Sequence, residues 1–376
     1  MRIAFYAPLK PPDHPVASGD RAMGRALIAA LGLAGHQVEV PSRFRSFDAG
    51  DAERQARLRD LGAALAERLL RRFDREKRRP DLWFTYHLYH KAPDWLGPAI
   101  TERLGTPYVL AEASFAPKQA GGRWDIGHRA AADAIRRADR IFQPNPADAE
   151  CVLPLIEGRE RLVTLPPFLE TAQWRAPDRE ASRARIASML DLDPAEPWLL
   201  TVAMMRDDQK LLSYRSLAEA LAGLVDLPWR IVIVGTGPAE SVVREAFAPI
   251  SGRVAWAGIA GEDMLRTLYR AADLYVWPAI KEAFGMALLE AQAAGLPAVV
   301  GRSGGVAAIV ADGETGLLIP EGNAKAFSDA IRSLLVDGHR RKAMGEAALH
   351  RTAQLNDITV AAAILDTHLR ALVDAR

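Results

Sequence analysis

The chain has 376 residues, 49% hydrophobic and 25% charged, and its 48 basic and 47 acidic residues leave a formal net charge of +1. This length predicts about two domains, and the balanced charge gives no reason to expect a nucleic acid as a partner. The single cysteine, Cys151, excludes an internal disulfide and a thiolate metal cluster. No apolar run approaches the roughly 18 residues of a membrane-spanning helix, and the first run is too short for a signal segment, so we expect a cytoplasmic protein.

Short apolar runs alternate with segments of helical periodicity from one end of the chain to the other. Strands separated by helices predict parallel sheets with helices on both faces. Each half of the chain holds about six such runs, so we expect an α/β protein with two doubly wound, Rossmann-like domains. The runs are 3–7, 37–40, 82–86, 108–111, 140–143, 162–165, 198–203, 230–234, 254–256, 274–277, 298–301 and 316–319.

The border between the two halves is rich in prolines and charges and contains no apolar run. We expect an N-terminal domain over residues 1–170, a connector over 171–196 with one helix at 179–190, and a C-terminal domain over 197–356. The last segment, 357–376, has apolar residues at helical spacing and predicts an amphipathic helix.

Three residues of the first half are candidates for binding. Gly19 lies between a proline-rich loop and a helical segment at 21–34, where a missing side chain leaves room for a phosphate or a sugar near the backbone. His87 and Glu112 lie at the ends of two predicted strands. The histidines there do not have metal-ligand spacing with another ligand, so we expect no metal site.

Segment 68–79 carries seven basic residues against two acidic ones, and leucines at helical spacing precede it. One interpretation is the solvated face of a helix that packs on the core. The other is a patch that contacts anionic lipid headgroups, which would place the protein at the periphery of the inner membrane face.

Two patterns of the second half follow predicted strands. Arg206 and Lys210 flank a short acidic turn after the first strand of this half. The next strand leads into Gly235 and Gly237, which is a weak dinucleotide-binding pattern. The third glycine and the acidic residue expected at the end of the following strand are both absent, and this argues against a dehydrogenase.

Glu282 and Glu290 stand eight positions apart in a segment that reads as strand, loop and helix. Glu282 falls in the loop and Glu290 about one turn into the helix, so both can face a ligand at the start of that helix. Free backbone N–H groups at a helix start suit a phosphate. Two carboxylates beside that phosphate can accept hydrogen bonds from sugar hydroxyls.

The spacing of Glu282 and Glu290, with Phe284 and Gly285 between them, resembles the signature of the retaining GT-B nucleotide-sugar glycosyltransferases, the group 1 or family 4 class. The resemblance is strongest over residues 198–335. It implies that Glu282 contacts the donor sugar and Glu290 the ribose, while the N–H groups between them hold phosphate and sugar oxygens. The donor-binding residues that it implies are Gly19, Gly237, Gly258, Ile259, Phe284, Gly285, Met286 and Glu290.

The resemblance also implies a reaction. Arg206 and Lys210 would neutralise the diphosphate as the sugar–phosphate bond breaks, and together with Glu282 they form the predicted catalytic set. A hexosyl group would pass from a nucleoside-diphosphate sugar to an acceptor with retained configuration and without a metal or another cofactor. The acceptor is a glycan, a lipid-linked molecule or a small molecule, and His87 and Glu112 would lie on its side.

The family further implies the GT-B fold, with two facing domains and with the terminal helix, 357–376, packed back on the first. The chain departs from the family pattern at several places. Leu211 follows Lys210 instead of a glycine, Glu112 stands where many members have a histidine, Gly19 stands alone instead of in a pair, and Ala307 and Ala308 stand in place of the usual Pro-Glu. Alternatives are an epimerase or phosphorylase of the same fold, a non-catalytic nucleotide- or sugar-binding protein with two lobes, and a dehydrogenase. The donor's base and sugar and the oligomeric state leave no signal in the sequence.

Overall fold

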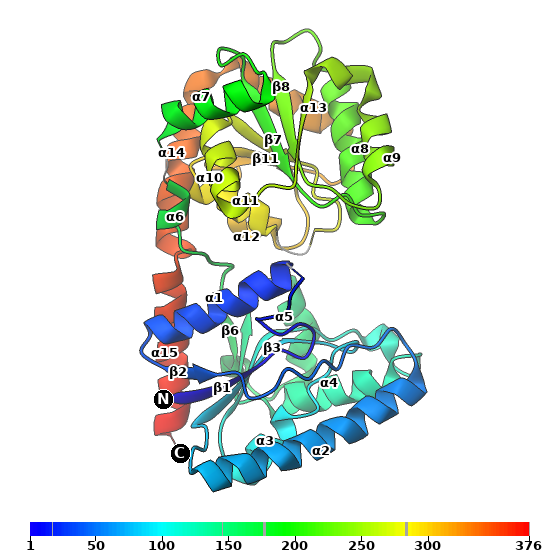
Figure 1. Ribbon diagram of the computed structural model, residues 1–376, viewed down its shortest axis with the longest axis vertical. Coiled ribbons are helices and arrows are strands. Elements are labelled where there is room, and N and C mark those ends of the chain that lie inside the picture. The colour runs from blue at the N-terminus through cyan, green and yellow to red at the C-terminus, as the bar shows by residue number, and fades with distance from the viewer. Residues whose placement is uncertain (17, 145, 176–177, 283–284, 376) are drawn as a thin grey trace. The chain divides into compact units, whose positions relative to one another are not determined.

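The chain divides into two compact units, and each is described by itself (Figure 1). The computed structural model describes residues 1–16, 18–144, 146–175, 178–282 and 285–375. Unit 1 comprises Met1–Pro166 and Ile358–Arg376, and unit 2 comprises Pro167–Asp357.

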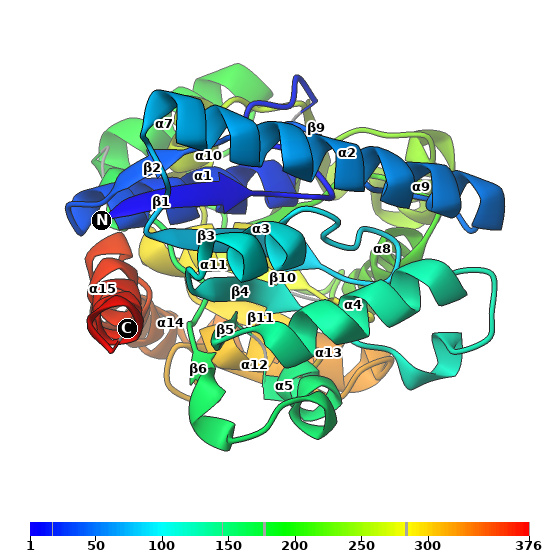
Figure 2. The same ribbon diagram turned by 90° about the horizontal axis from the view of Figure 1, so that it is seen from below.

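Unit 1 is built on a six-stranded parallel sheet with the strand order β2-β1-β3-β4-β5-β6. Helices α1 and α15 pack together on one face, and α2, α3 and α4 pack together on the other (Figures 1 and 2). The strands are β1 (Arg2–Tyr6), β2 (Gln37–Glu39), β3 (Leu82–Leu88), β4 (Tyr108–Ala113), β5 (Arg140–Gln143) and β6 (Leu162–Thr164). The helices are α1 (Gly19–Leu33), α2 (Ala52–Glu76), α3 (Gly97–Leu104), α4 (Asp125–Arg137), α5 (Pro146–Val152) and α15 (Ile358–Asp374).

The terminal helix α15 packs against α1, although more than 300 residues separate them in the sequence. Leu365 and Leu369 of α15 are fully buried. His36, in the turn after α1, places its Nε2 atom 3.1 Å from Asp366 Oδ1. The amphipathic pattern of the terminal segment is therefore satisfied within unit 1.

Unit 2 is also built on a six-stranded parallel sheet, with the strand order β12-β11-β10-β7-β8-β9. Its strands are β7 (Trp198–Val202), β8 (Arg230–Val234), β9 (Val254–Gly258), β10 (Leu274–Trp277), β11 (Ala298–Gly301) and β12 (Gly316–Ile319). Its helices are α6 (Ala172–Arg175), α7 (Arg179–Leu190), α8 (Gln209–Ala222), α9 (Glu240–Ala246), α10 (Glu262–Ala271), α11 (Met286–Ala293), α12 (Val306–Ile309), α13 (Ala324–Val336) and α14 (Gly338–Leu355).

The segment expected to be a connector, 171–196, is instead part of unit 2. Its helix α7 packs on α10. Arg179 and Arg183 of α7 hold the two carboxylate oxygens of Asp273 at 2.7 and 2.9 Å, directly before β10. A partly buried carboxylate bound by two guanidinium groups ties the segment to the sheet, so it does not act as a free linker.

In each sheet, the chain adds strands first on one side of its first strand and then on the other side. The strand order changes side between β1 and β3 in unit 1, and between β7 and β10 in unit 2. Ligands of doubly wound sheets bind outside the carboxyl ends of the strands at such a switch point. These two places are therefore where binding residues are expected. Among the described residues, no helix has both the length and the apolar character needed to cross a membrane.

Candidate functional site

At the switch point of unit 2, the loops after β7 and β10 bring Lys210 and Glu282 into contact. Lys210 starts the first turn of α8, where the cap residue Asp208 accepts its backbone N–H at 2.8 Å. The Nζ atom of Lys210 forms an ion pair with Glu282 Oε2. Trp277 Nε1 donates to the same oxygen at 3.2 Å, and its ring centre lies 5.3 Å from the Lys210 ammonium.

The backbone around Glu282 is fixed by neighbouring strands. Its N–H donates to the Ser303 hydroxyl at 3.0 Å. Ala279 and Lys281 have φ values of 52° and 50°, which are unfavourable for residues other than glycine and cost roughly 1–3 kcal/mol each. Gly301 of β11 lies so close to this loop that a Cβ atom there would overlap the carbonyl oxygen of Pro278. The surrounding structure thus holds the Glu282 side chain in one place.

The start of α11 is a second feature of this switch point. Gly285 is the cap residue at a φ of 100°, and no side chain of a described residue caps the helix. The N–H groups of Met286 and Ala287, in the first turn of α11, are therefore available for an anion, which the helix dipole also favours. The predicted donor contact Phe284 lies outside the described residues.

Glu290 lies on α11, and its carboxylate accepts a hydrogen bond from Tyr269 of α10 at 2.9 Å. Burial raises the pKa of Glu290 to about 7. Burial, and after it the charges of Glu282 and Glu290, raise the pKa of the hydroxyl group of Tyr275 on β10. The sequence spacing pointed to the two acids but not to these tyrosines, whose contacts are long-range.

Arg206 belongs to a loop that the Gly235–Gly237 turn supports. Its guanidinium is half exposed, with Nε 3.5 Å from Asp208 Oδ2. Met205 donates to the carbonyl of Thr236 at 3.0 Å and accepts from Ala239 at 2.9 Å. A Cβ atom on Gly237 would overlap the Met205 carbonyl oxygen. The glycine pattern therefore has a packing reason, which is to let the turn lie against the loop of Arg206.

Gly258 and Ile259 remain predicted contacts of the nucleotide. The carbonyl of Gly258 accepts the N–H of Gly235 at 2.8 Å, so the end of β9 lies beside the glycine turn. The side chain of Ile259 is 83% exposed.

At the switch point of unit 1, His87 and Glu112 lie at the ends of neighbouring strands with φ values of 59° and 58°. His87 Nδ1 lies 2.9 Å from Asp20 Oδ1 and 3.6 Å from Glu112 Oε1. The hydrogen bond from His87 holds the pKa of Asp20 below its usual value. Strained backbone at two adjacent strand ends is typical of functional sites. The sequence missed Asp20, although it directly follows Gly19.

A Cβ atom on Gly19 would meet no atom of a described residue within 4 Å, so packing against these residues does not require a glycine. The residue stands at the start of α1, whose cap is the hydroxyl of Ser18. The ionised Asp20 in the same turn disfavours an anion at this helix start. A sugar hydroxyl suits this position better than a phosphate.

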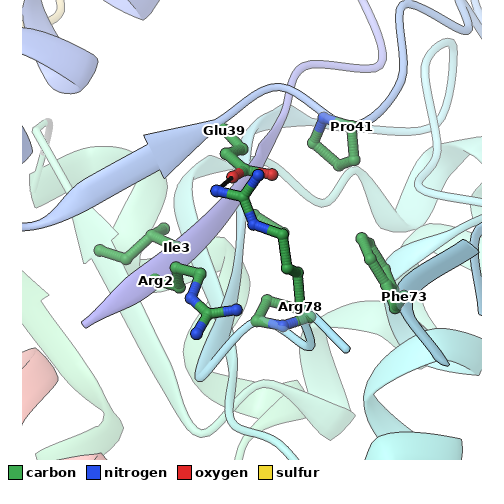
Figure 3. A pocket seen from close by; sticks show the side chains of 8 residues that line it. Arg2, Ile3, Glu39, Pro41, Phe73 and Arg78 are labelled. Atoms are coloured by element: carbon green, nitrogen blue, oxygen red, sulfur yellow. Dashed lines mark ion pairs between the residues drawn. The ribbon is translucent and has the colours of Figure 1, made fainter. Parts of the chain in front are cut away.

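The basic segment predicted at 68–79 forms the last turns of α2 and the residues that follow. Its apolar members, Leu69 and Phe73, are buried in the core of unit 1. Figure 3 shows Arg78 extended toward Glu39, with which it pairs at 3.1 Å. The interpretation as the solvated face of a core-packing helix agrees with these contacts.

Comparison with known proteins gives a family for unit 2. Residues 201–351 match the sequence model of the family Glycosyl transferases group 1. The D-inositol 3-phosphate glycosyltransferase of Nocardia farcinica is 32% identical over 251 residues, which is 63% of this chain and 54% of the relative. The protein of the same name from Acidothermus cellulolyticus is 29% identical over 321 residues, 80% of this chain and 70% of the relative. The chain thus spans about half to 70% of the length of these relatives.

Solved structures show the same fold. A sucrose-phosphate synthase from Thermosynechococcus elongatus superimposes with a TM-score of 0.76 at 21% identity, over 100% of both chains. Anabaena Alr3699/HepE in complex with UDP-glucose gives a TM-score of 0.71 at 16% identity, also over 100% of both chains. The predicted GT-B fold with two Rossmann-like domains is confirmed.

Proposed function

Because residues 201–351 match the sequence model of the family Glycosyl transferases group 1, we propose that the protein transfers a sugar from a nucleoside-diphosphate sugar to an acceptor. The observation that carries this proposal is the meeting of Lys210 and Glu282 at the switch point of unit 2, beside a helix start without a side-chain cap. These groups match the chemistry of such a donor. The cation and the free N–H groups suit its diphosphate, and the carboxylate suits the hydroxyl groups of its sugar.

The diphosphate of the donor would take the cations and the start of α11. Breaking the sugar–phosphate bond adds about one negative charge to the diphosphate, and fixed donors stabilise that charge more in the transition state than in the ground state. Lys210 is anchored by the cap of α8 and by Trp277, so it is already in place. Arg206, on the supported loop, can turn toward the same group.

The carboxylates would take the sugar hydroxyls. In the free protein the ammonium group of Lys210 is paired with the carboxylate of Glu282. A bound diphosphate competes for the ammonium, and Glu282 then accepts hydrogen bonds from the donor sugar. Glu290 and its partner Tyr269 would hold the ribose. We propose retention of configuration, with a diphosphate oxygen as the acceptor of the proton, and no metal or other cofactor.

The acceptor would be bound by unit 1 through Asp20, His87 and Glu112. Two carboxylates can accept hydrogen bonds and an imidazole can accept or donate one, and this set suits a molecule with several hydroxyl groups. The relatives named D-inositol 3-phosphate glycosyltransferases suggest a polyol of that kind. A neutral glycan and a lipid-linked sugar are the competing acceptors.

Calorimetric titration with UDP-, GDP- and ADP-sugars tests the donor. We expect one donor to bind, and its affinity to fall about tenfold or more in Lys210→Gln, because a charge-assisted contact to phosphate is lost. Lys325→Gln, an exposed lysine of α13, is the matched control. Failure of all the donors to bind would refute the proposal, and tight binding of NADH would favour the dehydrogenase. Turnover that needs phosphate but no acceptor would indicate a phosphorylase.

Contact with the inner face of a membrane is a separate proposal for α2. Arg68 and Arg71 are exposed and form no ion pair with any described residue, so they can attract anionic lipid. Because the apolar side of this helix is buried, the attraction would be electrostatic only. Sedimentation with phosphatidylglycerol vesicles, at low and high salt, tests it: we expect Arg68→Gln with Arg71→Gln to reduce binding, and equal binding by the variant would exclude this helix.

A further inference from the structure

Unit 1 contains a group of cations and aromatic rings outside the residues discussed so far, which we call the Trp124 cluster. It comes from the loop after β3, from the segment between β4 and α4, and from the first turn of α4, at the edge of the sheet where the parallel strands end (Figure 2). Its members are His90, Lys91, Lys118, Arg123, Trp124 and His128.

Trp124 is the fixed centre of this cluster. Its Nε1 atom donates to the carbonyl of Asp48 at 3.2 Å, and the residue is only 8% exposed. The Arg123 guanidinium carbon lies 3.9 Å from the ring centre, and the Lys91 ammonium lies 4.7 Å from it. The electron-rich face of an indole attracts cations. One buried ring thus holds two positive charges at a defined place.

The charges of the cluster are not balanced by acids. Within the described ranges, Lys91, Lys118 and Arg123 form no ion pair with a carboxylate, unlike the paired Arg78 of α2. The acids of the same loops are engaged elsewhere. Asp48 accepts two backbone N–H groups of its own turn at 2.6 and 2.7 Å, and Asp125 is bound at 2.7 Å by an arginine one turn along α4. An unbalanced group of cations attracts an anionic ligand.

His128 supplies an independent sign of a ligand. It is 6% exposed, its ring stacks on Phe115 at 4.6 Å, and its Nδ1 atom has no hydrogen-bond partner among the described residues. Buried polar atoms are normally paired, so this nitrogen is expected to meet a ligand atom or a water. Burial and the charges of Lys91, His128 and Lys118 lower the pKa of His90, whose ring lies 5.4 Å from that of Trp124.

A row of rings joins the cluster to the proposed acceptor group. The ring of Tyr89 lies 5.2 Å from His87 and 5.4 Å from His90, and His90 lies 5.4 Å from Trp124. The cluster and the Asp20–His87–Glu112 group are therefore neighbours on one side of the sheet. A single acceptor molecule can reach both, with a hydroxyl at His87 and another group at Trp124.

We propose that the Trp124 cluster binds a phosphate group of the acceptor, so that the acceptor is a phosphorylated polyol; this rests on the function proposed above. Arg123 offers a planar set of donors that matches phosphate oxygens, and Lys91 and Lys118 add point charges. A neutral glycan would leave all three cations without a counter-charge. The same phosphate can be carried by a soluble sugar or cyclitol phosphate or by a phospholipid headgroup.

Calorimetry without a donor tests the proposal on the full chain. The probes are inorganic phosphate, D-inositol 3-phosphate and unphosphorylated inositol. We expect the inositol phosphate to bind at least tenfold more tightly than inositol, more weakly at high salt, and in competition with inorganic phosphate. The double variant Lys91→Gln, Arg123→Gln should lose about tenfold or more of this affinity, because two charges that attract the phosphate are removed while Trp124 and its support remain. Arg136→Gln, an exposed arginine later on α4, is the control.

Other results of these titrations would overturn the phosphate site or identify the molecule that carries the phosphate. Equal binding of the two inositols, unchanged affinity in the double variant, or no binding of either phosphate probe would overturn the phosphate site. Binding of phosphatidylinositol 3-phosphate vesicles that depends on Lys91 and Arg123 would assign the phosphate to a lipid, and its absence to a soluble acceptor. Because these titrations contain no nucleotide sugar, failure of the proposed function appears separately, as loss of donor binding by the unaltered protein.

Discussion

Each switch point lies between the first strand of its unit and the strand that pairs on its other side, although the two strand orders differ, and the polar groups at the two places differ in kind. In unit 2 a lysine paired with Glu282 lies near the start of α11, which has no side-chain cap. In unit 1 the start of α1 is capped by Ser18 and carries Asp20, which is ionised and held by His87. The first arrangement attracts a phosphate and the second repels one. The fold thus fixes where a ligand binds, and a few side chains decide which ligand it is.

The largest effect should come from the acid of unit 2. We expect Glu282→Ala to lower the rate of sugar transfer by about a hundredfold or more, because a contact to the reacting sugar is lost, and to leave nucleotide affinity within about twofold. Product formation from a labelled donor and titration with the nucleoside diphosphate measure the two quantities. Glu346→Gln, on the exposed side of α14, should change neither. Unaltered turnover in Glu282→Ala would remove the assigned role.

The rigidity of the same switch point can be broken at Gly301. A methyl group there overlaps the Pro278 carbonyl oxygen, so Gly301→Ala must shift the loop that carries Glu282. We expect a loss of about 1–3 kcal/mol in the free energy of unfolding, as for other overpacked sites. Gly252→Ala is the matched control, because a Cβ atom there meets nothing within 4 Å. Equal urea-unfolding midpoints for the two variants would show that the loop can shift without lowering the free energy of unfolding.

A substitution at the switch point of unit 1 should change the binding of the acceptor and not that of the donor. We expect His87→Gln to raise the KM for the acceptor by about tenfold and to leave donor affinity unchanged, since a charge-assisted bond to Asp20 is replaced by a weaker one. Initial rates at varied acceptor, once an acceptor is identified, and donor titration measure both. Glu67→Gln on the exposed face of α2 serves as the control. A changed donor affinity with an unchanged acceptor KM would reverse the assignment of the two units.

The contrast between the units also explains what the sequence could and could not predict. The twelve predicted runs coincide with β1–β12 within one or two residues, because alternating strands and helices leave a local pattern of apolar residues. The acids of unit 2 were found because Glu282 and Glu290 lie in one short segment. The partners Tyr269 and Asp20, and the place of segment 171–196 in unit 2, depend on contacts between distant residues, which no local pattern records.

The smallest expected effect concerns the protonation of Glu290. Its pKa is raised to about 7 in the folded protein by burial, whereas an exposed glutamate titrates near 4.3. The folded state therefore binds the proton more tightly than the unfolded state, and the stability that this contributes is lost as the pH rises from about 4.3 to 7. Glu290→Gln cannot titrate, so its melting temperature should fall less than that of the unaltered protein between pH 5 and pH 8. The difference should be a few degrees, at roughly 2–4 °C per kcal/mol for a domain of this size. Parallel melting curves for the two proteins would show that Glu290 is ionised across this range, and the second carboxylate of unit 2 would then be as fully charged as Asp20 of unit 1.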